Sequence, residues 1–194
     1  MTVLVSLLAG CGTASSPEST VTDFCNALKN FDLRSAVSYF DGRNDELENL
    51  YSGSFKTEQL MKYLKNSAAK ITYTIGKTKI EKNKAEVPVV FIYVDASSVL
   101  SEAVGDYIKQ AFSLAFSEKE ESELENLFET IFLEKTESTN IDIQTCNVIF
   151  NCVNADGIWK IGPLNKSTQD AIVNIVTCNI YNIFSGLEKI SNFY

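Results

Sequence analysis

Residues 71–95 read ITYTIGKTKIEKNKAEVPVVFIYVD, and apolar side chains recur there at every second position. This period of two is typical of β-strands, because successive side chains point to opposite faces of a sheet. The polar residues 82–84 interrupt the pattern and predict a turn. The second strand, Ala85 to Asp95, has apolar residues on both of its faces. We therefore predict a long antiparallel hairpin whose second strand is central and covered on both sides.

Helical spacing precedes the hairpin. Ser16-Pro17-Glu18 is typical of a helix start, with a serine N-cap, a proline in the first turn and an acid near the positive end of the helix dipole. We predict a first helix that ends at about Asn30. A corner capped by Asp32 then leads into a short second helix, and residues 54–65 are expected to form a third.

Helical spacing returns after the hairpin, over 97–116 and again over 118–133, and predicts a helical pair inserted at about 97–135. The acidic run within Glu118 to Glu137 lacks the D-x-D-x-D-G loop of a calcium site, so it is interpreted as a solvated helix face.

Strand character resumes over 138–154. The apolar residues change parity between Ile143 and Val148, so we predict a bulge near Thr145. Asp156-Gly157 predicts a hairpin turn, and residues 158–163 predict a short closing strand. A last helix is expected from Ser167 to about Lys189. The order of elements predicts an α+β fold with antiparallel strands. Residues 17–194 are long enough for a single domain of this kind.

The composition limits the chemistry of the chain. Its net charge is −8 and it contains no histidine. Negative charge repels phosphate backbones, so nucleic acid is not expected as a partner. Without an imidazole, Ser-His-Asp and Cys-His catalytic systems are excluded. The cysteines form no C-x-x-C pair, and we expect no metal and no cofactor.

The cysteines after residue 11 are Cys25, Cys146, Cys152 and Cys178. Two interpretations are open, namely one or two disulfides or small buried apolar residues. Cys25 and Cys178 lie in the first and last predicted helices, so a staple between these helices is conceivable. Cys146 and Cys152 lie about 20 Å apart along an extended strand and cannot pair with each other.

The N-terminus has an uncharged apolar run followed by Leu8-Ala9-Gly10-Cys11 and a serine-rich segment. These residues resemble the lipobox of the bacterial lipoprotein signal-peptide family. The resemblance implies that Cys11 carries a diacylglycerol, which anchors the extracytoplasmic chain to the bacterial cell membrane. Residues 1–10 contain neither Lys nor Arg, so we expect a truncated signal segment there, followed by a lipidated tether over 11–16.

Short motifs at both ends of the domain carry a second resemblance. They are the Pro-Glu helix start, Phe-Cys-Asn-Ala-Leu, an Asn-Phe-Asp corner and Asp-Gly-x-Trp-Lys-Ile. The residues concerned are Phe24, Ala27, Leu28, Asp32, Ala36, Asp156, Gly157, Trp159 and Ile161. Over residues 17–95 and 138–162 the chain is similar to the nuclear transport factor 2-like, or cystatin-like, superfamily. The resemblance implies a curved antiparallel sheet packed on the N-terminal helix, which forms a cone that is either filled by side chains or open as a pocket.

The candidate pocket residues of such a cone are Tyr39, Tyr73, Tyr93, Asp95 and Trp159, with Asp32 as a further acid. Each also has a structural interpretation, because Asp32 can cap a helix, Asp95 ends a strand and the aromatic residues can fill a core. We assign no catalytic residue.

We expect a non-catalytic, lipid-anchored extracytoplasmic domain that binds an unknown protein, peptide or small molecule. Two alternatives stay open. One is an isomerase or hydrolase-like enzyme that uses a carboxylate in the cone, and the other is a structural or inhibitory surface protein that acts through the acidic helix pair.

Overall fold

The computed structural model describes residues 15–52, 58–115, 127–138 and 142–181. The helices are α1 (Pro17–Lys29), α2 (Leu33–Ser38), α3 (Asp45–Ser52), α4 (Glu58–Ala68), α5 (Ser97–Ala115), α7 (Leu127–Ser138) and α8 (Lys166–Thr177). The strands are β1 (Thr72–Ile75), β2 (Lys79–Glu81), β3 (Lys84–Asp95), β4 (Asp142–Ala155) and β5 (Ile158–Ile161). The fold is thus α+β, as predicted.

The strands form one open antiparallel sheet in the order β1-β3-β4-β5, and β2 pairs with the start of β3. The predicted hairpin is confirmed, because β1 pairs with β3 from Thr72↔Ile92 to Ile75↔Val89. β3 also pairs with β4 along its whole length, from Lys84↔Val153 to Asp95↔Asp142. Its predicted central position is therefore confirmed as well.

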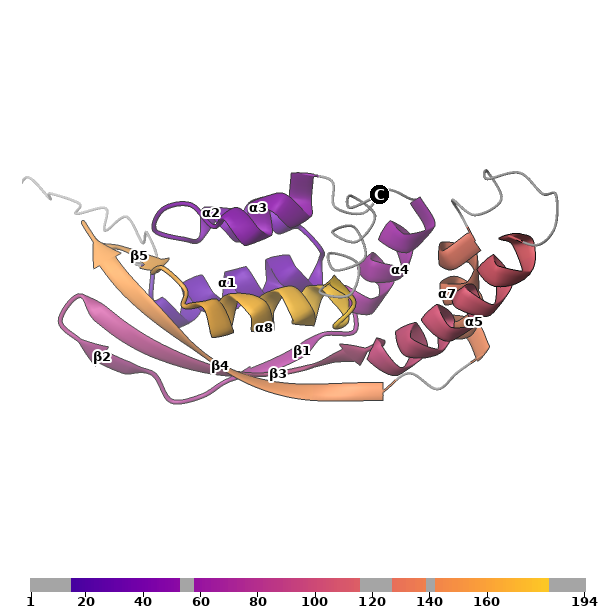
Figure 1. Cartoon of the computed structure of the whole chain (residues 1–194). Helices are drawn as coiled ribbons and strands as arrows, with labels where there is room; N and C mark the ends of the chain where they lie inside the picture. The colour runs from indigo at the N-terminus through magenta and orange to yellow at the C-terminus, as the bar shows by residue number, and fades with distance from the viewer. Residues whose placement is uncertain (1–14, 53–57, 116–126, 139–141, 182–194) are drawn as a thin grey trace, which may run out of the picture.

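The described helices that pack on the sheet lie on one of its faces (Figure 1). α1 and α8 lie along this inner face, and α5 and α7 lie beyond the end of β3. The opposite face, here called the outer face, carries Val90 and Ile92, which are 38% and 43% exposed. The prediction that β3 is covered on both sides is therefore wrong for these residues. Only Val94, near the start of α5, is buried on that side.

The predicted bulge near Thr145 is also wrong. The β3–β4 register runs without a shift through Thr145, which pairs with Ile92. The prediction assumed that every apolar residue of the strand faces the core. Ile143 instead lies on the outer face, where it is 72% exposed, so no change of parity is needed.

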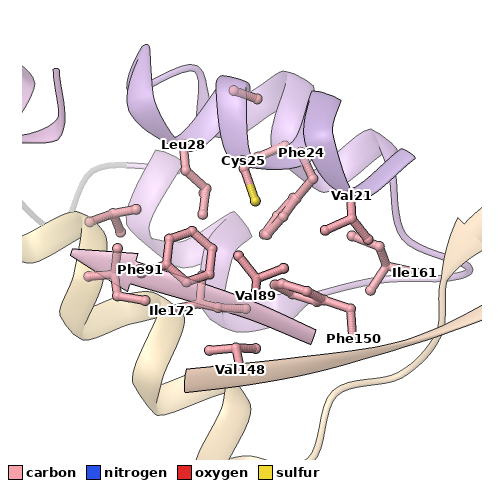
Figure 2. Close-up of a cluster of buried hydrophobic side chains, with 14 of the residues drawn as sticks. Val21, Phe24, Cys25, Leu28, Val89, Phe91, Val148, Phe150, Ile161 and Ile172 are labelled. Atoms are coloured by element: carbon pink, nitrogen blue, oxygen red, sulfur yellow. The ribbon is translucent and has the colours of Figure 1, made fainter. Parts of the chain in front are cut away.

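Aromatic side chains fill the space between the inner face and the helices (Figure 2). Phe24 of α1, Phe91 of β3 and Phe150 of β4 are fully buried. The Phe24 and Phe150 rings meet edge to face with centroids 5.3 Å apart, and those of Phe91 and Phe150 lie 6.4 Å apart. Such contacts stabilise a core beyond the burial of apolar area. The interior of the sheet is thus filled at this point.

The N-terminal helices are capped by the residues that the sequence predicted. Ser16 caps α1 with its hydroxyl, which accepts from the Ser19 N–H at 3.0 Å, and Asp32 caps α2 in the same way through the Ser35 N–H. The predicted third helix corresponds to α4, whose described part begins at Glu58. The helical pair is present as α5 and α7, and residues 116–126 lie outside the described part.

The last helix ends earlier than predicted. α8 stops at Thr177 rather than near Lys189, because Cys178 and Asn179 adopt the left-handed conformation with φ of 55° and 63°. Residues 182–194 lie outside the described ranges. The predicted hairpin turn is confirmed, and its Asp156 and Gly157 both have positive φ.

Substitutions at two neighbouring residues of β3 test whether its inner face is buried and its outer face is exposed. We expect Phe91→Ala to lower the free energy of unfolding by about 3–5 kcal/mol, because it leaves a cavity in the filled core. Ile92→Thr keeps a β-branched residue on the outer face and should cost less than about 1 kcal/mol. Urea denaturation of both variants measures this, and equal losses would contradict the one-sided arrangement.

Candidate functional site

The five candidate pocket residues do not form one pocket. Tyr73 donates its hydroxyl proton to Asn26 Oδ1 at 2.7 Å and so ties β1 to α1. The Trp159 carbonyl accepts from the Thr20 hydroxyl at 3.2 Å, and its backbone N–H donates to Ser15 Oγ at 3.1 Å. These contacts fasten β5 to the start of α1, so both aromatic residues have structural partners.

Tyr39 lies at the C-terminal end of α2. It lines a hollow of about 240 Å³ with Asp23, Asn26 and Asp32. Burial, followed by the charges of Asp23 and Asp32, raises the pKa of the Tyr39 hydroxyl. Asp32 itself accepts from the Ser35 hydroxyl at 2.6 Å and the Ser35 N–H, and these bonds lower its pKa. The carboxylate is thus engaged as the cap of α2.

Tyr93 and Asp95 form a buried polar cluster with Asn179, at the place where α8 ends and α5 begins. The Tyr93 hydroxyl donates to Asn179 Oδ1 at 3.3 Å, and Asp95 accepts from the Ser97 N–H at 2.9 Å. Burial acts to raise the pKa of Asp95, which is only 4% exposed. Hydrogen bonds from Ser97, Asn179 and Gln144 outweigh burial and hold this pKa below its usual value.

Asn179 was not identified from the sequence. The signal available was a weak one, because asparagine tolerates the left-handed conformation that ends helices. The conformation of Cys178 allows its carbonyl to accept from the Ala96 N–H at 3.0 Å. The cluster therefore joins three elements, and its residues are engaged with one another.

The four described cysteines carry free thiols. Cys25 and Cys178 pack in two different hydrophobic clusters, and the staple between them is absent. Burial raises the pKa of Cys25 and Cys152 to about 12 and that of Cys178 to about 11. These three are small buried apolar residues. Cys146 on β4 differs, because it is partly exposed.

The largest feature that the sequence did not identify as a site is the outer face of the sheet. The exposed apolar residues of its two long strands are Val90, Ile92, Ile143 and Ile149. Pro88 pairs with Ile149 and Val94 pairs with Ile143, so the apolar residues of both strands are neighbours. The alternation on β3 was the available signal, but it was interpreted as a sign of burial.

A groove of about 480 Å³ lies at the β2 end of the sheet. Charged side chains of both signs line it: Lys79, Glu81, Lys84 and Glu86. Lys79 and Glu86 form an ion pair of 3.5 Å between exposed side chains. The groove and the apolar residues together give the outer face a polar end and an apolar middle.

Other kinds of site find little support in the described ranges. No group of three or more acidic or thiol side chains there could hold a metal ion. No described helix is long and apolar enough to cross a membrane. In the helical pair, Lys135 of α7 forms an ion pair with Asp106 of α5 at 2.8 Å. The acidic residues 118–126 lie outside the part that the structure describes.

No protein-family model, curated protein or solved structure matches this chain.

The lowered pKa of Asp95 predicts how stability depends on pH. The carboxylate is stabilised in the folded state, so its contribution is present above the unfolded pKa of about 4 and is lost as pH falls through the lower folded pKa. We expect Asp95→Asn to be less stable than the wild type at neutral pH and to lose less stability below about pH 4.

Denaturation at a series of pH values measures this difference. If the free energy of unfolding of Asp95→Asn falls with pH as steeply as that of the wild type, the assignment of this acid dependence to the Asp95 carboxylate is wrong.

Proposed function

We propose that this chain is a non-catalytic binding domain, held on the extracytoplasmic side of a bacterial cell membrane by a lipid on Cys11. Its binding surface is the outer face of the sheet, and its ligand is an extended polypeptide segment with apolar side chains. The single observation that carries this proposal is the row of exposed apolar residues on β3 and β4.

The spacing of these residues supports an extended ligand. Pro88, Val90 and Ile92 are alternate residues of β3, so they repeat about every 7 Å along the strand. An extended polypeptide presents the side chains of one face at the same interval. Large exposed apolar patches on soluble domains mark interaction sites, and the groove beside Lys79 and Glu86 offers polar partners at one end.

The engagement of the candidate acids supports binding rather than catalysis. A general base must reach its substrate with a suitable pKa. Asp32 is used as a helix cap, and Asp95 is buried with its pKa lowered by hydrogen bonds. A carboxylate in this state is a weak base.

The family and the anchor are parts of the same proposal. We assign the fold to the nuclear transport factor 2-like, or cystatin-like, class, supported by the packing of α1 on an antiparallel sheet whose last hairpin carries Asp156-Gly157. The lipobox residues Leu8 to Cys11 support the anchor. The first described residue, Ser15, contacts β5, so a tether of a few residues would hold this end of the sheet near the membrane.

Selection from a random peptide library tests the binding surface. Peptides enriched on the wild-type chain should carry apolar residues at alternate positions. Val90→Lys introduces a charge into the apolar middle of the outer face and should weaken their binding about tenfold or more. Titration calorimetry with a selected peptide measures the change.

A substitution outside the proposed surface distinguishes specific peptide binding from nonspecific binding to exposed apolar residues. Phe112 is 64% exposed and belongs to α5, which lies beyond the end of β3 (Figure 1). Phe112→Lys should therefore leave peptide affinity unchanged. Equal losses in Phe112→Lys and Val90→Lys, or no enriched peptides, would contradict the proposed surface.

Lipidation is tested separately by intact mass and membrane partition of the chain made in bacteria behind a complete signal peptide. We expect a diacylglycerol mass increment and membrane retention, both absent in Cys11→Ser. An unmodified Cys11 in a soluble protein would overturn the anchor without affecting the peptide-binding surface.

A further inference from the structure

β4 has an edge that no other described strand occupies. It pairs with β3 from Asp142 to Val153, but β5 covers its other side only from Cys152 onward. The last contact on that side is the Gly162 N–H, which donates to the Asn151 carbonyl at 2.7 Å. Among the described residues, 142–150 therefore form a free strand edge.

The backbone groups on this edge belong to the odd-numbered residues. Asn151 directs its carbonyl toward β5, whereas the N–H of Asn154 points the other way, to the Asn83 carbonyl beside β3. Backbone groups alternate along a strand. The N–H and C=O groups of Ile143, Thr145, Asn147 and Ile149 consequently point outward from the sheet.

This edge lacks the protection that natural sheets give to free strands. Long exposed edges are usually interrupted, charged or covered, because they are templates for pairing with another chain. The opposite edge is interrupted between β1 and β2 and carries Lys77, Lys79 and Glu81. Residues 143–149 contain no charged side chain and no proline. Among the described residues, the β4 edge therefore lacks the interruption and the charges that the opposite edge has.

We propose that a second copy of this chain covers it, with the two β4 strands antiparallel across a two-fold axis. The free edge runs from residue 142 to residue 150. The free edges of the two copies therefore overlap most when Cys146, at their midpoint, lies on the axis. Ile143 then pairs with Ile149 of the partner subunit, and Thr145 pairs with Asn147 of the partner subunit. This register joins odd residues to odd residues, as the outward backbone groups require.

The side chains favour a second copy as the occupant. The pairing brings Ile143 and Ile149 together on the outer face, where they are 72% and 55% exposed in the single chain. It places no like charges opposite each other between 143 and 149. The pairing joins two outer faces into one sheet surface. It does not depend on the proposed peptide binding, because Val90 and Ile92 lie one strand away from the axis.

Cysteine cross-linking in the full chain carrying Cys11→Ser tests the register. Cys146 would face Cys146 of the partner subunit as a non-hydrogen-bonded pair, with Cα atoms about 4.5 Å apart, which suits a disulfide. Diamide, which accepts the two electrons and two protons of the thiols, should convert the folded chain into a disulfide-linked dimer. Cys146→Ser should abolish that dimer, because the other described thiols are buried.

A mixing experiment provides the matched control. In the Cys146→Ser background, Ile143→Cys and Ile149→Cys should cross-link with each other when mixed and should not cross-link when either is alone. Homodimers that form as readily as the mixed dimer would overturn the register.

Sedimentation across a concentration series tests the association itself. Thr145→Pro removes an outward N–H from each copy and should weaken the dimer about tenfold or more, whereas Thr145→Ala keeps the N–H and the affinity. A wild-type chain that stays monomeric at every concentration, with no Cys146 dimer, would overturn the proposal. Peptide binding to the outer face would stand in that case.

Discussion

The pairing of β3 with β4 along all twelve residues of β3 is the interaction on which the rest of the structure depends. This ladder fixes the parity of both strands, because a shift of one residue would turn every side chain to the other face. It brings Phe91 and Phe150 to the inner face, where α1 and α8 cover them. The same parity leaves Val90 and Ile149 on the outer face.

The side chains of the two faces differ in how they are engaged. On the inner face, aromatic packing and hydrogen bonds to helix ends engage the side chains that could have been catalytic. Asp95, for example, is held between the end of α8 and the start of α5. On the outer face, Val90, Ile92, Ile143 and Ile149 are exposed. Burial of these residues by a ligand or a second copy would be favourable, because it removes apolar area from water.

Local signals in the sequence predicted most of the elements, although α3 was not among them. The hairpin follows from its period of two, and Ser16 and Asp32 cap the helices as expected. The errors on the sheet share one cause, which is the assumption that apolar residues are buried. That assumption led to the predictions that β3 is covered on both faces and that β4 has a bulge at Thr145. Which face the helices cover depends on contacts distant in sequence, so alternation alone cannot decide it. The end of α8 was missed because two consecutive left-handed residues, Cys178 and Asn179, have no strong local signature.

Amide hydrogen exchange along β4 tests most directly whether the unpaired side of the sheet is where this molecule associates. The amides of even-numbered residues such as Val148 bond to β3 and should exchange slowly at every protein concentration. The outward amides of Thr145 and Asn147 should exchange fast in dilute solution and become protected as the concentration rises. Fast exchange of both at every concentration would contradict association through this edge.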